Sequence, residues 1–183
     1  ESFAVSVGID GHSSPGSITA HQKLTKDSGN TVTELCKVRV AASNGYTFWF
    51  SADSGKIWAR NSSGTWTLAT TTTAAAGGVN CLGAAEYNGY IYWATESRLH
   101  RIAIADADDA WASISLNWAT FAVTNASYHP MAIQDLTLFI GDGHQVASVD
   151  DAGVFNNNAL DILSPLIIKT MVEYEIDLLI GTI

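Results

Sequence analysis

The sequence predicts an all-β fold of β-propeller-like repeats: four-stranded antiparallel blades, about three and a half of them. Short apolar strands begin at positions 46, 90, 136 and 176, spaced by 44, 46 and 40 residues, an interval typical of propeller blades. Tight-turn signals separate these strands, and no segment shows a helical periodicity of useful length. The strand segments are Tyr46-Thr-Phe-Trp-Phe, Tyr90-Ile-Tyr-Trp-Ala, Leu136-Thr-Leu-Phe-Ile and Ile176-Asp-Leu-Leu-Ile.

The first repeat, residues 34–78, contains every part of one blade. Its four predicted strands are residues 34–40, 46–50, 56–60 and 65–69. Asn44-Gly45 predicts a two-residue type I′ turn between the first two strands, because that turn needs positive φ at both central positions. The stretch rich in Thr, Ala and Gly at 70–78 is interpreted as the link to the next blade.

The later repeats become less complete along the chain. The second repeat, residues 79–125, repeats the turn signal as Asn88-Gly89 and is expected to place its outer strand at 111–116. The third, residues 126–165, has a poor outer-strand signal after residue 150, and the fourth, 166–183, has strand signals only at 167–172 and 176–180. Residues 1–33 are expected to form an N-terminal lead-in segment, with Phe3–Val7 as a strand free to pair elsewhere.

Three and a half blades do not close a propeller ring, which typically has about four to eight. The last hairpin would leave an apolar strand edge that invites pairing with another chain. Two explanations stay open: the chain is part of a longer polypeptide, or other copies complete the ring. Other protein subunits, in an oligomer or a larger assembly, are therefore the expected partners.

Composition excludes several functions. The net charge of −9 disfavours nucleic acid and anionic membrane surfaces as partners, and no apolar stretch approaches the ~20 residues that span a bilayer. Cys36 and Cys81 lack the spacing of a zinc site and are expected to be buried free thiols, with a bridge between neighbouring repeats as the alternative. No cofactor is expected.

A hairpin motif with the pattern S-x-D-x-G-x-x-W spans Ser51, Asp53, Gly55 and Trp58. It resembles the Asp box, a structural turn repeated in sialidase-type propellers and placed away from their catalytic centre. The Asp carboxylate is expected to accept hydrogen bonds from turn amides, while Gly supplies positive φ and Trp packs against the hairpin. The resemblance therefore implies a propeller and says little about sialidase activity.

The sequence predicts no catalytic or metal site, so an enzyme is not expected. The four arginines do not recur at matched positions, as a sialidase-like cluster would require; they are Arg39, Arg60, Arg98 and Arg101. Asp142 and His144 lack a third ligand nearby, and the acidic run at 106–109 lacks the Gly and Glu of an EF-hand loop. No histidine stands in a nucleophile motif.

Tryptophans are the residues most suited to contact a ligand or partner. Trp49 and Trp93 occupy equivalent repeat positions and are expected in the core between blades. Trp66, Trp111 and Trp118 fall on outer strands or loops, where they would serve glycan stacking or protein contact.

A second resemblance bears on function. The Ser-Pro-Gly lead-in, the phrase Asp27-Ser-Gly-Asn-Thr-Val-Thr-Glu-Leu and the blade Gly-Lys-Ile-Trp…Gly-Thr-Trp-Thr-Leu are similar to propeller-repeat proteins of tailed phages and environmental viruses. This resemblance implies a non-enzymatic virion structural or tail-associated protein, in the virion or extracellular, that works through protein–protein contacts. The alternative is a lectin-like propeller that binds carbohydrate for host or surface attachment.

Overall fold

The computed structural model describes residues 9–10, 19–20, 31–72, 78–111 and 128–183. The chain divides into two units, Glu1–Val32 and Thr33–Ile183. In the first unit, the strands β1 (Ile9–Asp10) and β2 (Thr19–Ala20) pair antiparallel. The strand expected at Phe3–Val7 lies outside the described residues.

The second unit consists of four antiparallel sheets, and the part of it that the structure describes contains no helix. The first sheet runs in the order β3 (Cys36–Ala41), β4 (Thr47–Ser51), β5 (Lys56–Arg60) and β6 (Trp66–Thr71). The second contains β7 (Gly83–Tyr87), β8 (Tyr90–Ala94) and β9 (Leu99–Ala103). The third runs from β10 (Met131–Gln134) through β11 (Thr137–Asp142) and β12 (Gln145–Val149) to β13 (Phe155–Asp161). The fourth is the hairpin β14 (Ile168–Tyr174) and β15 (Asp177–Thr182).

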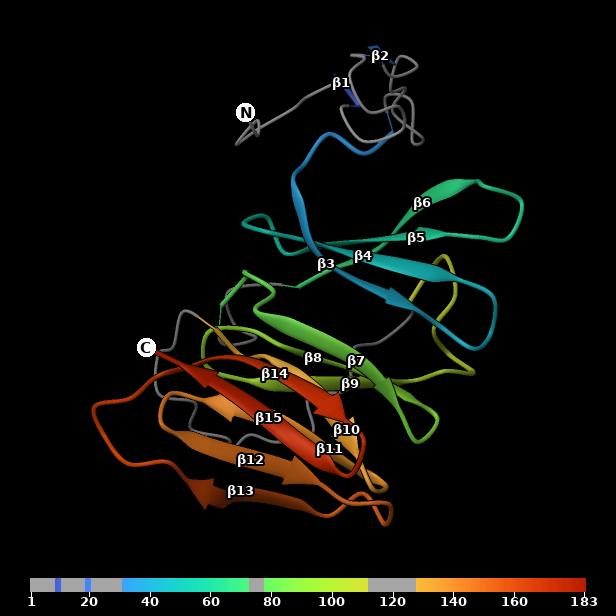
Figure 1. Ribbon diagram of the computed structural model, residues 1–183. Coiled ribbons are helices and arrows are strands. Elements are labelled where there is room, and N and C mark those ends of the chain that lie inside the picture. Colours follow the sequence, from blue (N-terminus) through green and yellow to red (C-terminus); the bar gives the residue numbers. More distant parts are fainter. Residues whose placement is uncertain (1–8, 11–18, 21–30, 73–77, 112–127) are drawn as a thin grey trace. The chain divides into compact units, whose positions relative to one another are not determined.

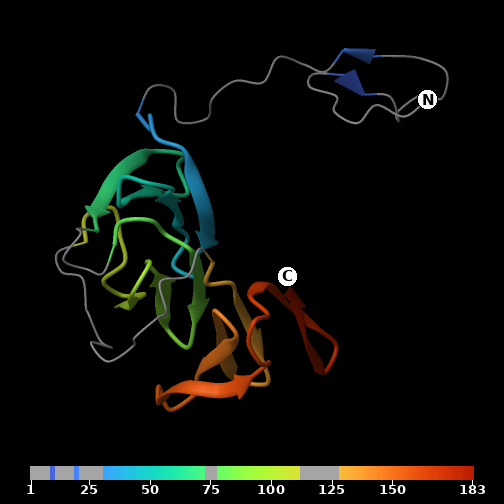
Figure 2. The ribbon, with the colours of Figure 1, turned by 90° about the vertical axis from the view of Figure 1, so that its left-hand side faces the viewer.

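These sheets follow one another as blades. The first strands of successive sheets lie side by side, β3 against β7, β7 against β10, and β10 against β14 (Figures 1 and 2). Each sheet then runs outward from its first strand, as the blades of a propeller do. The all-β prediction of repeated blades is confirmed.

Three of the four predicted strand starts, at Tyr46, Leu136 and Ile176, are one residue early, because the strands begin at Thr47, Thr137 and Asp177. Leu136 and Ile176 are turn residues, because Gln134 pairs with Thr137 and Tyr174 pairs with Asp177. Both apolar side chains are exposed, and Leu136 has φ +58°.

The two Asn-Gly turns differ from each other. Asn88 and Gly89 both have positive φ and form the two-residue turn that the sequence predicts. At Asn44-Gly45 only the glycine has positive φ, and Ala42 N–H donates to the Tyr46 carbonyl at 2.8 Å, so the loop contains three residues. The expected type I′ turn is therefore wrong for the first blade.

The outer strand of the third blade is well formed, in contrast to the poor signal in its sequence. β13 pairs with β12 over its whole length, with a bulge between Val146 and Ser148. Its Asn-rich side chains are exposed, so the strand forms through backbone pairing and not through an apolar pattern. The outer strand expected at 111–116 lies, except for Trp111, outside the described residues.

The core lies between blades. Each blade has a face toward the blade before it, here called its trailing face, and a face toward the blade after it, its leading face. Phe48 and Phe50 on the leading face of the first blade pack against Ile91 and Trp93 on the trailing face of the second. The second interface joins Tyr92 and Ala94 to Leu138 and Ile140, and the third joins Ala132 and Phe139 to Met171, Leu178 and Ile180.

The cysteines follow the expectation of free thiols. Cys36 is half-buried and Cys81 is buried in the first interface, and the two form no bridge. Burial raises the pKa of the Cys81 thiol to about 12, so this side chain acts as a small apolar residue.

Candidate functional site

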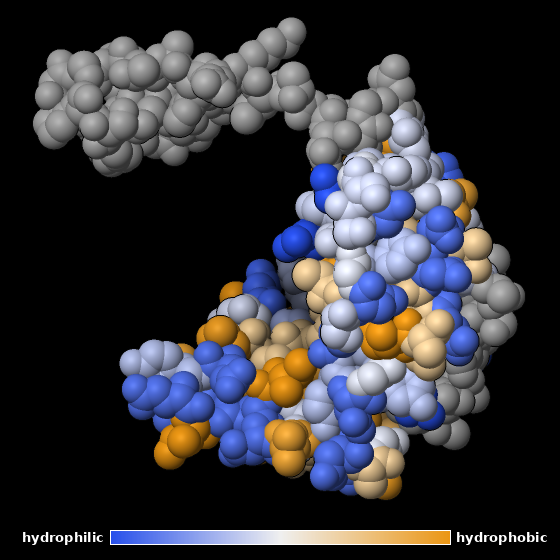
Figure 3. Space-filling model, turned by 90° about the vertical axis from the view of Figure 1, so that its right-hand side faces the viewer, coloured by the Kyte–Doolittle hydropathy of each residue, from blue (hydrophilic) through white to orange (hydrophobic). Residues whose placement is uncertain are grey.

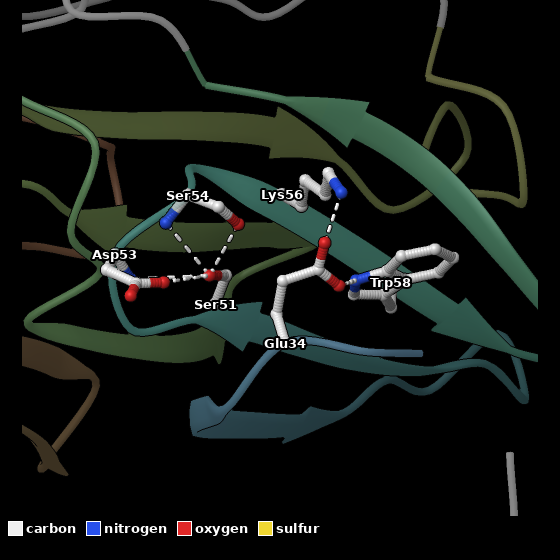
Figure 4. A network of polar contacts seen from close by, with 6 residues as sticks. All are labelled: Glu34, Ser51, Asp53, Ser54, Lys56 and Trp58. Carbon is white, nitrogen blue, oxygen red and sulfur yellow. Dashed lines mark hydrogen bonds and ion pairs between the residues drawn. The ribbon is translucent and has the colours of Figure 1, made fainter. Parts of the chain in front are cut away.

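The turn at 51–58 is held by the hydroxyl of Ser51. This oxygen accepts hydrogen bonds from the backbone N–H of Asp53 at 3.3 Å and of Ser54 at 3.0 Å, and from the Ser54 hydroxyl at 2.7 Å (Figure 4). The Asp53 carboxylate is exposed, and among the described residues its hydrogen-bond donor is the Ser51 hydroxyl, at 3.4 Å. The expected acceptor was the Asp carboxylate; in the structure the serine takes that role.

The other two residues of the motif fix the turn to its surroundings. Gly55 has φ +71°, and a Cβ atom at this position would lie 2.1 Å from the carbonyl oxygen of Thr72. Trp58 is buried, and its Nε1 donates to Glu34 at 3.1 Å, while Lys56 pairs with the same carboxylate (Figure 4). The hydrogen bond from Lys56 holds the pKa of Glu34 below its ordinary value. All these contacts stabilise the blade.

Trp49 and Trp66 lie together on the trailing face of the first blade. Their ring centroids are 5.9 Å apart, and the guanidinium of Arg39 stands 5.6 Å from the Trp49 ring. Both tryptophans are half-buried, and Arg39 is exposed. The sequence predicted a contact role for Trp66; it did not place Trp49 beside it, and the expected core position of Trp49 is only partly realised.

Trp111 is not available for contact with a ligand. It is 6% exposed and packs against Phe48 at 5.1 Å and Trp93 at 5.5 Å between ring centroids. The expectation of a surface tryptophan is wrong because the chain after the second blade folds back over the first interface, where Trp111 N–H donates to the Ala69 carbonyl. Trp118 lies outside the described residues.

Equivalent residues of the four blades identify the two uncovered faces. On the trailing side, the matching cross-strand pairs are Arg39–Trp49, Ala84–Trp93, Met131–Ile140 and Met171–Ile180. The last three pairs belong to the apolar clusters between blades. Only Arg39–Trp49 has no described blade packed over it, so the trailing face of the first blade is open among the described residues.

The leading side shows the same pattern at the other end. The matching pairs are Val40–Phe48, Ala85–Tyr92, Ala132–Phe139 and Val172–Leu179. The first three pairs take part in the interfaces between blades, whereas Val172 is 54% and Leu179 is 49% exposed. Tyr174 on the same face is 59% exposed. Among the residues that the structure describes, the leading face of the fourth blade is therefore apolar and open.

The surface drawn in Figure 3 shows apolar patches set among hydrophilic side chains. Fourteen large hydrophobic side chains are exposed over the described residues, and eight of them follow residue 162. These eight are Leu163, Leu166, Ile167, Val172, Tyr174, Ile176, Leu179 and Ile183. Exposed apolar side chains are thus concentrated at and beside the last hairpin.

The polar candidates do not gather into a catalytic constellation. No group of three potential metal ligands occurs among the described residues. Asp142 is buried in the third blade, whereas His144 stands at the surface 4.0 Å from Asp161. Arg39 stacks on Trp49 and Arg101 on Tyr90, in different blades. No helix of the described part has the length and apolar character to cross a bilayer.

Two buried histidines, His100 and His129, were missed by the sequence analysis. His129 is fully buried, and its Nδ1 lies 2.8 Å from the Gly141 carbonyl oxygen. Burial lowers the pKa of His129 against the opposing effects of the Gly141 carbonyl and of Glu96. In the sequence, His129 is visible only as a polar residue directly before Pro130 and the first strand of the third blade, and this position does not by itself indicate burial.

Solved structures share this fold. Virginiamycin B lyase from Staphylococcus aureus is 18% identical with a TM-score of 0.59, over 90% of this chain and 53% of the lyase. A streptogramin B lyase structure is 14% identical with a TM-score of 0.60, over 90% of this chain and 52% of its own. A nidogen/laminin complex matches at 15% identity and a TM-score of 0.53, over 92% and 60% of the two chains.

These similarities show a β-propeller fold and nothing finer, because each identity is below one in five. The chain spans about half the length of the two lyases. No protein-family model matches the sequence, and no curated protein does.

Proposed function

We propose that this chain is a non-enzymatic β-propeller segment that acts as a virion structural or tail-associated subunit, in the virion or extracellular, through protein–protein contacts. The observation that carries the proposal is the open, apolar leading face of the fourth blade, with Val172, Tyr174 and Leu179 all about half exposed or more. Contiguous apolar surface of this kind marks protein interaction sites in soluble proteins. The edge of the two-stranded sheet adds backbone groups that can pair with another strand.

Two further observations support the proposal. One of the matched structures is itself a complex between two proteins, nidogen and laminin. The Asp-box-like turn consists of contacts that stabilise the blade, which is consistent with a structural motif of a virion or tail propeller.

The second candidate function is carbohydrate binding for host or surface attachment. The pair Trp49–Trp66 with Arg39 favours it, because adjacent indole rings beside a polar group form a flat platform on which a sugar can stack. The burial of Trp111 weakens this alternative, since one of its three expected tryptophans is not accessible.

The test is the mass of the protein isolated from its natural source. Native mass spectrometry is expected to show the chain bound to other protein subunits, and denaturing conditions to release it from them. A native protein with no bound subunit would contradict the proposal. The carbohydrate function is tested by calorimetric titration of the native protein and of its Trp66→Ala variant with mixed glycans. Binding that the native protein shows and the variant loses would support carbohydrate binding.

A further inference from the structure

We propose that the inner side of the blades carries a binding site for a phosphate or sulfate group, formed by Lys37, Tyr128 and Lys169. This inference goes beyond the proposed function, because it assigns a small anionic ligand and uses neither of the two open faces. Lys37 lies in β3 of the first blade, Tyr128 stands just before β10 of the third, and Lys169 lies in β14 of the fourth. Three blades therefore contribute one side chain each.

Both ammonium groups approach the same aromatic ring. The Nζ atom of Lys37 is 5.7 Å and that of Lys169 is 5.3 Å from the centroid of the Tyr128 ring. Because these two distances add to 11.0 Å, the two nitrogens can be no farther apart than that. The second blade separates the first from the third, so Lys37 reaches Tyr128 across the space beside the inner strands and not through a shared interface.

A β-bulge directs each of the two lysines. In the first blade the register shifts between Cys36 and Val38, so Lys37 is the extra residue. In the fourth blade it shifts between residues 168 and 170, so Lys169 is the extra residue. The inner strands of the second and third blades pair without such a shift. A bulge leaves its extra residue outside the ladder and re-aims the side chain, and bulges are frequent beside functional sites.

The positive charge of the pair is not neutralised by the described part of the chain. Neither Lys37 nor Lys169 forms an ion pair with a described carboxylate. The segments 73–77 and 112–127, which the structure leaves undescribed within the blade unit, contain no Asp or Glu. Both lysines are exposed and Tyr128 is 39% exposed, so a solute can reach all three side chains. In a chain of net charge −9 this is an unusual concentration of positive charge.

The chemistry of two neighbouring lysines selects the ligand. An ammonium group binds phosphate as a compact point charge, and its hydrogen bonds to a charged oxygen are strong. A carboxylate would neutralise only one of the two lysines, whereas a phosphate or sulfate group carries about two charges and several acceptor oxygens. The Tyr128 ring adds a flat apolar surface on which a sugar can stack. The ligand is therefore a phosphate or sulfate group, either free or carried by a sugar.

The site does not depend on the two open faces. The first strands of the four blades lie side by side, and these strands position the three side chains. A further blade before the first or after the fourth would pack on an open face and extend the row of blades. The contacts of Lys37 and Lys169 with the Tyr128 ring would remain as they are.

The experiment is a titration of the isotope-labelled protein with sodium phosphate and, separately, with sodium sulfate, followed in amide NMR spectra. The expected result is saturable shifts of the amide signals at Lys37, Tyr128 and Lys169, with a dissociation constant in the millimolar range or below. Sodium chloride at the same ionic strength is expected to give no saturable shift, which separates binding from general screening of charge. Glucose 6-phosphate and glucose are titrated in the same way.

Variants test each side chain of the site. Lys37→Gln and Lys169→Gln are each expected to raise the dissociation constant for phosphate roughly tenfold, because each removes one charged donor. Tyr128→Leu is expected to raise it about two- to fivefold, because the lysines lose the ring that holds them together. The matched control is Arg101→Gln, which also removes a cation stacked on a tyrosine, Tyr90, but in the third strand of the second blade. This control is expected to bind phosphate as the wild type does.

The amide spectrum of each variant also shows whether it is folded. A glutamine variant that is not folded is replaced by the methionine variant, which removes the charge and keeps an unbranched side chain.

The outcomes decide the inference and the source of the anionic group. Absence of saturation with both anions would overturn it, as would an effect of Arg101→Gln equal to that of the lysine variants. If glucose 6-phosphate binds at least about tenfold tighter than phosphate and glucose does not bind, the group is carried by a sugar; equal affinities identify the free anion. The proposed function is tested by the subunits bound to the native protein, so either proposal can fail while the other stands.

Discussion

Trp93 and Trp49 occupy the same position in neighbouring blades, yet their surroundings differ. Trp93 is 1% exposed because the leading face of the first blade covers it, with Phe50 at 6.2 Å between ring centroids. Trp49 is half-buried, with Arg39 and Trp66 beside it and no described blade over it. The blade sequence therefore determines which residue can form an interface, while the presence of a neighbouring blade determines whether it is buried.

The largest expected effect is the loss of Trp93. Trp93→Ala should lower the free energy of unfolding by about 3–5 kcal/mol, because it removes a fully buried indole and leaves a cavity in the first interface. Trp49→Ala, the matched variant on the open face, should cost about 1 kcal/mol or less in the isolated monomer. Urea denaturation measures both. Equal losses would show that the two positions are covered alike.

The second effect concerns the turn of the first blade. Gly55→Ala should lower the free energy of unfolding by about 1–3 kcal/mol. The alanine would have to keep the left-handed φ of +71°, and its Cβ would lie 2.1 Å from the Thr72 carbonyl oxygen. Gly45→Ala is the control, since it has φ +90° but no atom within 4 Å of the added carbon. Thermal unfolding should therefore rank Gly55→Ala as the more destabilising variant; the reverse order would contradict the contact with Thr72.

The fold was largely predictable because blades repeat. Strand spacing and turn residues fixed the number and type of sheets, and the four-stranded plan of the first blade was predicted correctly. The strand starts of the later hairpins were not, because Leu136 and Ile176 are apolar residues in turns and were counted as strand. Hydrophobic pattern alone does not separate an exposed apolar turn residue from the first residue of a strand.

The candidate surfaces were less predictable, for a physical reason. Trp111 is buried by contacts with Phe48 and Trp93, which come from two other parts of the sequence, and no local pattern encodes such contacts. β13 forms although its Asn residues carry a weak strand signal, because β12 offers a paired edge. Burial and pairing of this kind are decided by neighbouring elements, and tertiary context overrides local propensity.

The interface between the second and third blades contains a buried group whose titration makes its stability depend on pH. His129 is buried with a pKa below its ordinary value of 6.5, so below that pH the unfolded chain binds a proton that the folded chain does not. Its stabilising contribution is present above pH 6.5 and is lost as the pH falls toward the lowered pKa. Urea unfolding between pH 7.5 and about 5 should show this loss, and His129→Asn should remove that part of it.

His144→Gln is the control for that experiment, because the His144 side chain remains accessible to water in the folded protein. The two variants should differ in the slope of the unfolding free energy against pH, and not only in its value at pH 7.5. If His129→Asn keeps the wild-type slope, the buried histidine is not the group that titrates.

The smallest effect compares one hydrogen bond in a closed interface with its counterpart on an open face. Tyr87→Phe should cost about 0.5–1.5 kcal/mol, because it removes the hydroxyl that donates to Leu136 in the next blade. Tyr174→Phe should leave the unfolding free energy of the dilute monomer unchanged within about 0.5 kcal/mol, since its side chain is 59% exposed. Urea denaturation at low concentration measures the difference.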